Sequence, residues 1–210
     1  MAVYNGYMSR RRTLTDEQLI AASARVIGRL GPARLTLADV AEEAGLAPAT
    51  LLQRFGSKRG LLLEVARAGK KGIMECFARV RAAHPSPLRA IFAAVETMAQ
   101  MAETPEALAN HLAFLQIDLT DPDFRSLAVE CSRATEAGYR ALLTEAIAAG
   151  ELTRCNPRRL ARVIAALEGG SMLAWAIRRE GCVTAWLRKD LETVLRPLCA
   201  PQKGRARRAI

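Results

Sequence analysis

The sequence predicts an all-α protein of about nine helices, and three observations support this fold class. Half of the 210 residues are hydrophobic while aromatic residues make up only 5%, and alanine and leucine dominate, a composition that favours helix over sheet. Apolar residues recur at helical spacing along most of the chain. No segment alternates between apolar and polar residues as a half-buried strand would, and no internal repeat is found.

The first helix is expected over residues 15–30. Thr15 followed by Gln18 has the spacing of a capping box, in which the hydroxyl accepts from a backbone N–H and the amide reaches back. Leucine, isoleucine and valine then fall on one face. Gly31-Pro32 ends this pattern, because neither residue favours helix continuation.

Two short helices follow closely. Thr36 opens the first of them, with Asp39 in its first turn where a negative charge is favourable. Gly45 stands where a left-handed residue ends a helix. The next helix covers roughly residues 47–55 and is barely two turns long, with Pro48 near its first position, where a missing N–H costs little.

The rest of the chain continues the helical pattern, interrupted by short proline-containing breaks. Ser57 can cap the long helix that begins at residue 58. Five further helices are expected. They are a helix over residues 88–103, a helix that starts at Thr104-Pro105, a helix from Asp121 or Pro122 to about residue 149, a helix from Pro157 to about residue 179, and a helix over residues 185–198.

The net charge of +10 is unevenly distributed. Residues 1–60 carry nine basic and five acidic residues, residues 61–200 carry eighteen and sixteen, and residues 201–210 carry four basic residues and no acid. This asymmetry indicates a polyanionic partner for the N-terminal segment, and the phosphate backbone of nucleic acid is the commonest polyanion. The alternative is a charge excess that serves only solubility.

Several function classes lack their sequence signals. No apolar run approaches the ~20 residues of a membrane span, and the N-terminus lacks a secretory signal, so we expect a soluble, cytoplasmic protein without a membrane partner. Five scattered cysteines and two histidines form no zinc pattern, so no metal or cofactor is expected. No catalytic motif is present, which leaves an all-α enzyme a remote alternative. A membrane-surface protein is disfavoured because the basic ends lack an apolar face.

A DNA-binding helix–turn–helix needs a supporting helix, a tight turn with glycine, and a short second helix whose outward residues enter the major groove. Residues 36–55 supply all three, and basic residues crowd the end of the second helix. The alternative is two ordinary helices of a bundle.

The stretch LTLADVAEEAGLAPATLLQRFGSKRGLL, residues 35–62, resembles the DNA-binding signature of the TetR family of transcriptional regulators. The resemblance implies a flexible basic arm at 1–14, a helix–turn–helix domain at 15–58, a helical ligand-binding and dimerisation domain at 59–200, and a basic tail at 201–210. It assigns Thr36 and Lys58 to phosphate, Thr50 to DNA, and Phe55 to seating the recognition helix.

Three residues depart from the family pattern. Leu52 replaces the usual tyrosine, whose hydroxyl commonly reaches phosphate, and Ala47 replaces a capping serine or threonine, at a cost of ~1 kcal/mol. Pro48 stands where polar residues often face DNA. Gln53 and Arg54 therefore become the best candidates for base or backbone contacts. The complete predicted DNA-binding set is Thr36, Pro48, Ala49, Thr50, Gln53, Arg54, Lys58, Arg10, Arg11 and Arg12.

The resemblance also implies a homodimer on a palindromic operator of double-stranded DNA, because one helix–turn–helix reads too few base pairs. The predicted dimer contacts, on the last two long helices, are Leu167, Gly170, Ser171, Ala174, Leu187, Leu191 and Val194. The predicted pocket for a small-molecule effector comprises Met98, Met101, His111, Phe114, Gln116, Met172 and Trp175, each of which is also a candidate for plain core. Glu168 faces either this cavity or the solvent.

The expected function is a dimeric transcriptional repressor that a small molecule releases from its operator. A DNA-binding regulator or nucleoid-type factor without an inducer is the alternative. Both predict sequence-specific DNA binding, and only the first predicts release by a ligand.

Overall fold

The fold is that of a computed structural model, which describes residues 14–100 and 104–200. Within these ranges the chain forms nine α-helices and no strand, apart from an isolated bridge between Leu152 and Cys199. The predicted sites Arg10, Arg11, Arg12 and Met101 and the basic tail lie outside the described residues. In chain order the helices are α1 (Asp16–Arg34), α2 (Leu37–Ala44), α3 (Pro48–Phe55), α4 (Lys58–Ala83), α5 (Pro87–Ala99), α6 (Pro105–Thr120), α7 (Pro122–Ala148), α8 (Pro157–Arg178) and α9 (Val183–Leu195), followed by the 3-10 helix η2 (Arg196–Leu198).

The predicted caps at Thr15 and Ser57 are confirmed by their hydrogen bonds. The Thr15 hydroxyl accepts from the N–H of Gln18 at 3.3 Å, and the Gln18 side chain accepts from the N–H of Thr15 at 3.0 Å. Ser57 caps α4 by accepting from the N–H of Gly60 at 3.0 Å.

Three predicted helix ends need correction. The first helix breaks at Gly31, as expected, but a further turn follows to Arg34. The helix predicted to reach residue 103 ends at Ala99. The last helix begins two residues early, at Val183, and its final residues form η2. Each difference lies at a helix terminus, where boundaries are the least well defined by the sequence.

The buried side chains form two separate hydrophobic clusters. The first, here the head cluster, joins α1–α3 to the start of α4 and to Phe124 of α7. The second, the bundle cluster, joins the end of α4 to α5, α7, α8 and α9. Leu61 and Leu62 belong to the head cluster, while Phe77 and Val80 belong to the bundle cluster. The two ends of α4 therefore pack in different clusters.

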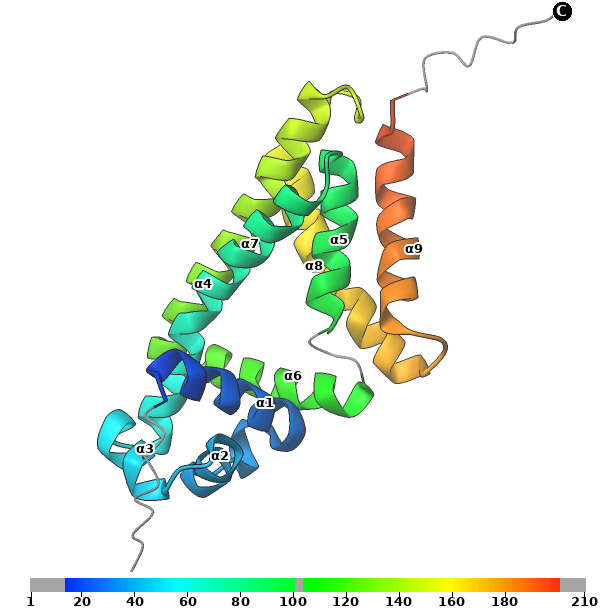
Figure 1. The fold of residues 1–210 in the computed structure, drawn as a ribbon. Helices are drawn as coiled ribbons and strands as arrows, with labels where there is room; N and C mark the ends of the chain where they lie inside the picture. Colours follow the sequence, from blue (N-terminus) through cyan, green and yellow to red (C-terminus); the bar gives the residue numbers. More distant parts are fainter. Residues whose placement is uncertain (1–13, 101–103, 201–210) are drawn as a thin grey trace, which may run out of the picture.

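The arrangement in Figure 1 places α1, α2 and α3 at one end of the molecule and α5, α8 and α9 toward the other. Helix α6 packs along α1, and the Asn110 side-chain amide donates to the Gly28 carbonyl at 2.8 Å. Gly31 adopts φ 74° and ψ 161°, a conformation that side chains with a Cβ avoid. The break in α1 therefore lies directly against α6.

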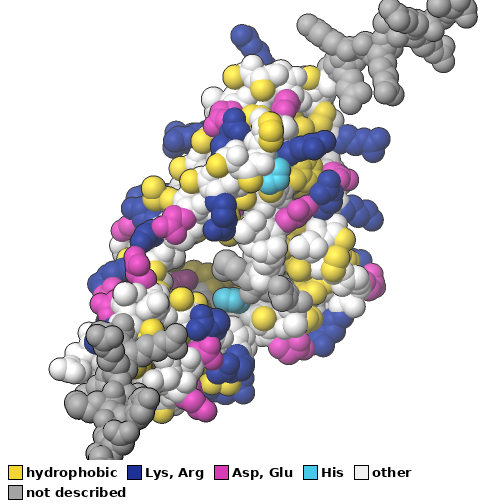
Figure 2. All heavy atoms as spheres, viewed as in Figure 1, with side chains coloured by type: hydrophobic (Ala, Val, Ile, Leu, Met, Phe, Trp, Pro, Cys, Tyr) yellow, Lys and Arg dark blue, Asp and Glu magenta, His cyan; other side chains and the backbone are white. Residues whose placement is uncertain are grey.

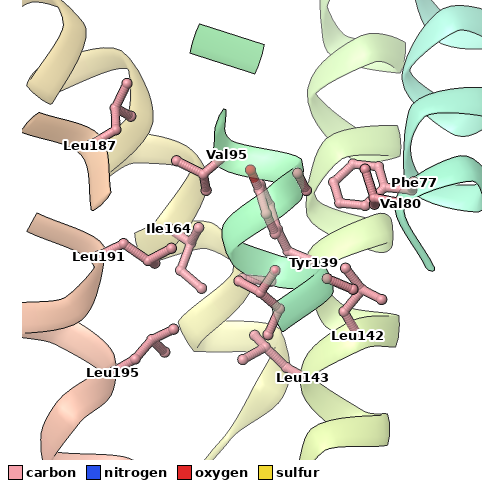
Figure 3. Packing of buried hydrophobic residues seen from close by; sticks show 14 of the residues in the cluster. Phe77, Val80, Val95, Tyr139, Leu142, Leu143, Ile164, Leu187, Leu191 and Leu195 are labelled. Carbon is pink, nitrogen blue, oxygen red and sulfur yellow. The ribbon is translucent and has the colours of Figure 1, made fainter. Parts of the chain in front are cut away.

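The centre of the bundle cluster is an aromatic pair, Phe77 and Tyr139, whose rings meet edge to face with centroids 4.9 Å apart (Figure 3). Gly138 of α7 lies under the Phe77 ring, so that a Cβ built there would overlap the ring carbons. The close contact between α4 and α7 thus requires glycine at this position.

We expect Gly138→Ala to lower the free energy of unfolding by ~1–3 kcal/mol, because the buried Phe77 ring must move. The control is Gly72→Ala, in the exposed part of α4, where an added Cβ meets nothing within 4 Å and reduced chain entropy should stabilise by ~0.5–1 kcal/mol. Thermal unfolding at one protein concentration measures both. Equal unfolding midpoints for the two variants would mean that the Phe77 ring can move aside without loss of stability.

Candidate nucleic-acid interface

Helix α3 has one buried face and one outward face. Leu51 is fully buried in the head cluster, and Phe55 packs against that cluster from the same helix. Pro48, Ala49 and Gln53 are exposed on the outward side. The inward side chains thus hold a short helix on the surface of the head with its other face open to a partner.

The turn before α3 has the geometry of a helix–turn–helix. Gly45 adopts the left-handed conformation at φ 67° and ψ 37°, and the N–H of Leu46 donates to the carbonyl of Ala41 at 2.8 Å, which satisfies the end of α2. Ala47 has an extended backbone and provides no side-chain cap to α3, because its methyl group cannot accept a hydrogen bond. The recognition helix therefore depends on Leu51 and Phe55 for its placement.

Thr36 is exposed at the start of α2, but its hydroxyl is engaged in a capping box. The hydroxyl donates to Asp39 Oδ2 at 2.7 Å and accepts from the Asp39 N–H at 3.2 Å. Hydrogen bonds from the Thr36 hydroxyl, and next from its backbone N–H, hold the pKa of the Asp39 carboxyl below its usual range. A charged carboxylate thus stands beside the predicted phosphate contact.

The basic residues at the end of α3 and the start of α4 point to three different places. Arg54 donates to the Leu14 carbonyl at 2.6 Å and to Asp16 Oδ1 at 3.1 Å, and only 28% of its side chain is exposed. Lys58 Nζ donates to the Ala33 carbonyl at 2.7 Å.

The third of these cations, Arg59, faces away from α3. It pairs with Asp121 at 2.9 Å and Asp123 at 2.8 Å, at the junction of α6 and α7. The basic cluster of the sequence is therefore distributed over three intramolecular contacts in the structure. Of the predicted DNA-binding residues that the structure describes, Thr36, Pro48, Ala49 and Gln53 are exposed and Thr50 is half-buried. Arg54 and Lys58 are instead engaged by Leu14 and by residues of α1.

Leu52 lies on the outward side of α3 with 53% of its surface exposed. A large apolar side chain at this exposure on a recognition helix has no packing role in the head. Sequence reasoning treated it only as the loss of a tyrosine hydroxyl. The structure presents it as apolar surface that can contact a thymine methyl group.

The structure does not bring the predicted effector residues into one site. Trp175 is buried in the bundle cluster, where its indole N–H donates to the Gly181 carbonyl at 3.1 Å; Met98 and Met172 pack against the same cluster. Phe114 instead packs on the head cluster, edge to face with Phe124. The remaining two are His111, which lies beside Gly28, and Gln116, which is exposed.

Figure 2 shows a hollow in the surface at the place where Figure 1 leaves an opening between α4, α5 and α6.

Asp118 of α6 is half-buried, and burial raises the pKa of its carboxyl. Sequence reasoning missed this residue, although an acid within the apolar run AFLQIDLT was the available signal.

Glu168 faces neither the solvent nor an open cavity. It is buried, and its Oε1 accepts from the Tyr139 hydroxyl at 3.0 Å. Burial raises the pKa of Glu168 to about 7, although the bond from Tyr139 opposes the shift. A carboxyl that is partly protonated at neutral pH thus joins α7 to α8 inside the bundle cluster.

Two predicted dimer contacts are wrong, because Leu187 and Leu191 are fully buried within the protomer's own bundle cluster. Ser171 is also buried and donates to Asp190 Oδ2 at 2.6 Å. Gly170 is exposed. The apolar face of α9 packs on the bundle, so it is not available to a second subunit.

Helix α8 instead carries an exposed apolar stripe, which repeats at intervals of three and four residues. It consists of Val163, Ala166, Gly170, Leu173 and Ile177. Helix α8 is long and apolar enough to cross a membrane by length and composition alone. Only 28% of its most apolar window is buried within the protomer, so much of its apolar surface is exposed. Of these side chains, Leu173 is 45% and Ile177 is 75% exposed.

Comparison with known proteins agrees with the geometry of the head. Residues 19–65 match the model of the "Bacterial regulatory proteins, tetR family". The chain is 30% identical over 173 residues to an HTH-type transcriptional regulator BetI from Agrobacterium fabrum, covering 80% of this chain and 78% of that one.

Solved structures share the fold over nearly the whole chain. Reduced NemR of Escherichia coli superposes with a TM-score of 0.71 at 18% identity, over 89% of this chain and 98% of that one. FadR of Bacillus subtilis, solved in complex with stearoyl-CoA, superposes with a TM-score of 0.63 at 18% identity, over 86% and 98%.

The contact between Arg54 and Asp16 predicts a role in positioning α3. We expect Asp16→Ala to weaken specific DNA binding about two- to fivefold, since an exposed ion pair contributes ~0.2–1 kcal/mol. Glu17→Ala is the matched control, because it removes a neighbouring negative charge from the same helix turn whose partner is Lys71. Fluorescence anisotropy with a labelled duplex measures both. If both variants bound DNA more tightly, reduced repulsion of phosphate would be the explanation and Arg54 would not brace the helix.

Proposed function

Because the chain belongs to the TetR family of bacterial regulatory proteins, we propose that it is a dimeric repressor that a small molecule releases from a palindromic operator. The chain is a helix–turn–helix transcriptional regulator. The observation that carries the proposal is the open outward face of α3, held by Leu51 and Phe55 on the head cluster. We place its action in the cytoplasm, where its DNA target lies.

In this proposal the protein contacts both the bases and the phosphates of the DNA. Gln53 is exposed on α3 and can pair with adenine, while Leu52 offers apolar contact to a thymine methyl. Thr36, Thr50 and Lys58 contact phosphate, together with the helix starts of α2 and α4, where backbone N–H groups favour anions. Arg54 contributes by holding α3 against α1.

The exposed stripe of α8 supports the dimer. A second copy covering the stripe of Val163, Ala166, Gly170, Leu173 and Ile177 would bury this apolar surface by two-fold symmetry. Gly170 lies in the middle of the stripe, with nothing within 4 Å of the place a Cβ would take, so a partner helix can approach closely there. Leu167 and Ala174 of α8 and Val194 of α9, which were also predicted as dimer contacts, are half-buried in the protomer.

The release by a ligand rests on the contacts between the head and the bundle. Helix α6 packs along α1 and borders the hollow, so a ligand that favours one position of α6 would shift the population of head orientations. FadR, which shares the fold, holds stearoyl-CoA, and this supports a ligand-responsive role without identifying the ligand here.

Selection from a random pool of duplex DNA at physiological salt should recover an inverted repeat. Within that site, Gln53→Ala should relax the preference at particular bases by ~1–3 kcal/mol, whereas Lys58→Ala should weaken binding to all sequences and lower the salt slope by ~1. Loss of specific and non-specific affinity to the same extent in both variants would contradict this assignment of α3. The recovered operator then becomes the probe for release by small molecules; an operator complex that no compound releases would favour the regulator without an inducer.

Replacing the stripe with charge should separate the subunits. We expect Leu173→Arg combined with Ile177→Arg to give a monomer by sedimentation equilibrium and to weaken operator binding at least tenfold, because one head reads only a half-site. Val129→Arg, which changes an exposed apolar residue on α7, is the control and should remain dimeric. A double variant that stayed dimeric would place the interface elsewhere.

A further inference from the structure

A groove on the outer surface between α7 and α8 is lined mainly by arginine. Two adjoining hollows of about 350 Å³ and 360 Å³ share Arg158 and Glu136. Arg159 and Arg162 complete the first hollow, and Arg133 and Arg140 complete the second. We call this surface the arginine groove.

The five arginines of the groove lack counter-ions within the described part of the chain. None of them takes part in an ion pair there, whereas arginines elsewhere, such as Arg25 and Arg188, pair with carboxylates at 2.7 Å. Glu136 is the single acid that lines the groove, and it forms no ion pair either. Like charges held this close repel one another, and an anion bound between them would remove the repulsion.

The two helices place these arginines at a regular spacing. Arg133 and Arg140 are two turns apart on α7, and Arg158 and Arg162 are one turn apart on α8, so each pair lies on one face of its helix. The start of α8, capped by Asn156, borders the first hollow and adds the partial positive charge of a helix N-terminus. Guanidinium groups bind phosphate oxygens in bidentate fashion, so a cluster of arginines is a suitable site for phosphate.

We propose that the arginine groove binds a compound with two or more phosphate groups, such as a nucleoside polyphosphate. The two hollows each offer their own pair of arginines, with Arg158 common to both, so that neighbouring phosphates can occupy them together. Glu136 lies at the junction, where its carboxylate accepts a hydrogen bond from a hydroxyl or amino group of the ligand. The site is separate from the hollow that α6 borders and from α3, which lies at the other end of the molecule from the start of α8 (Figure 1).

Isothermal titration of the full chain with inorganic triphosphate, with ATP and with orthophosphate tests the proposal. We expect triphosphate and ATP to bind at least tenfold more tightly than orthophosphate, because only they span both hollows. The double variant Arg140→Ala with Arg158→Ala removes one arginine from each helix and should lose at least tenfold in affinity for triphosphate. Both residues are exposed, so we expect the thermal unfolding midpoint to stay close to that of the parent chain.

Arg125→Ala is the matched control, because Arg125 is exposed on the same helix and does not line the groove. It should leave triphosphate binding unchanged. Equal losses in the control and the double variant would reduce the groove to diffuse positive charge and overturn the proposal.

The absence of binding by triphosphate and ATP at low salt would also overturn the proposal. If the double variant then weakened duplex DNA binding, the groove would be a second nucleic-acid contact. If it changed the sedimentation behaviour instead, the groove would face a second copy of the chain.

Discussion

The orientation of the recognition helix depends on α4, because the two ends of this helix lie in different hydrophobic clusters. Its first turns carry Leu61 and Leu62 into the head cluster, and its last turns carry Phe77 and Val80 into the bundle cluster. At 26 residues the helix is ~39 Å long. A small tilt of α4 against α7 would therefore be magnified at the head, so contacts that set this tilt would also set the spacing of the two heads in the proposed dimer.

A second connection limits that motion. Arg59 pairs with two acids at the α6–α7 junction, and its guanidinium lies 5.6 Å from the centroid of the Phe124 ring. Asn110 binds the carbonyl of Gly28 on the other side of the head. The head is thus held at three places by α4, α6 and the start of α7. In the proposed release by a ligand, a change in one of these contacts would favour a different head orientation, while the other two would keep the head on the bundle.

Local features of this fold were predictable from the sequence, and long-range ones were not. Thr15, Thr36, Ser57 and Gly45 act on backbone groups within a few residues of themselves, so spacing alone identified them. Arg54 was predicted to face DNA but reaches Leu14, forty residues away, because a flexible side chain selects its partner only after folding.

The same limit explains the errors on α8 and α9. Both helices have apolar residues at helical spacing, and the sequence does not say whether such a face packs within one subunit or between two. Leu187 and Leu191 pack within the protomer, whereas Ile177 is exposed. Similarly, the sequence left open whether Glu168 faces a cavity or the solvent, and its partner Tyr139, on a different helix, was found only in the structure.

The break in α1 makes two positions that are distant in the sequence, 31 and 110, depend on each other. Gly31 needs its positive φ, and a Cβ there would also lie 2.9 Å from Asn110 Oδ1. Replacing the glycine would strain the backbone at this φ and would push the Asn110 side chain aside, away from its hydrogen bond to Gly28. We expect Gly31 and Asn110 to vary together among descendants of this chain, because both belong to the contact between α1 and α6.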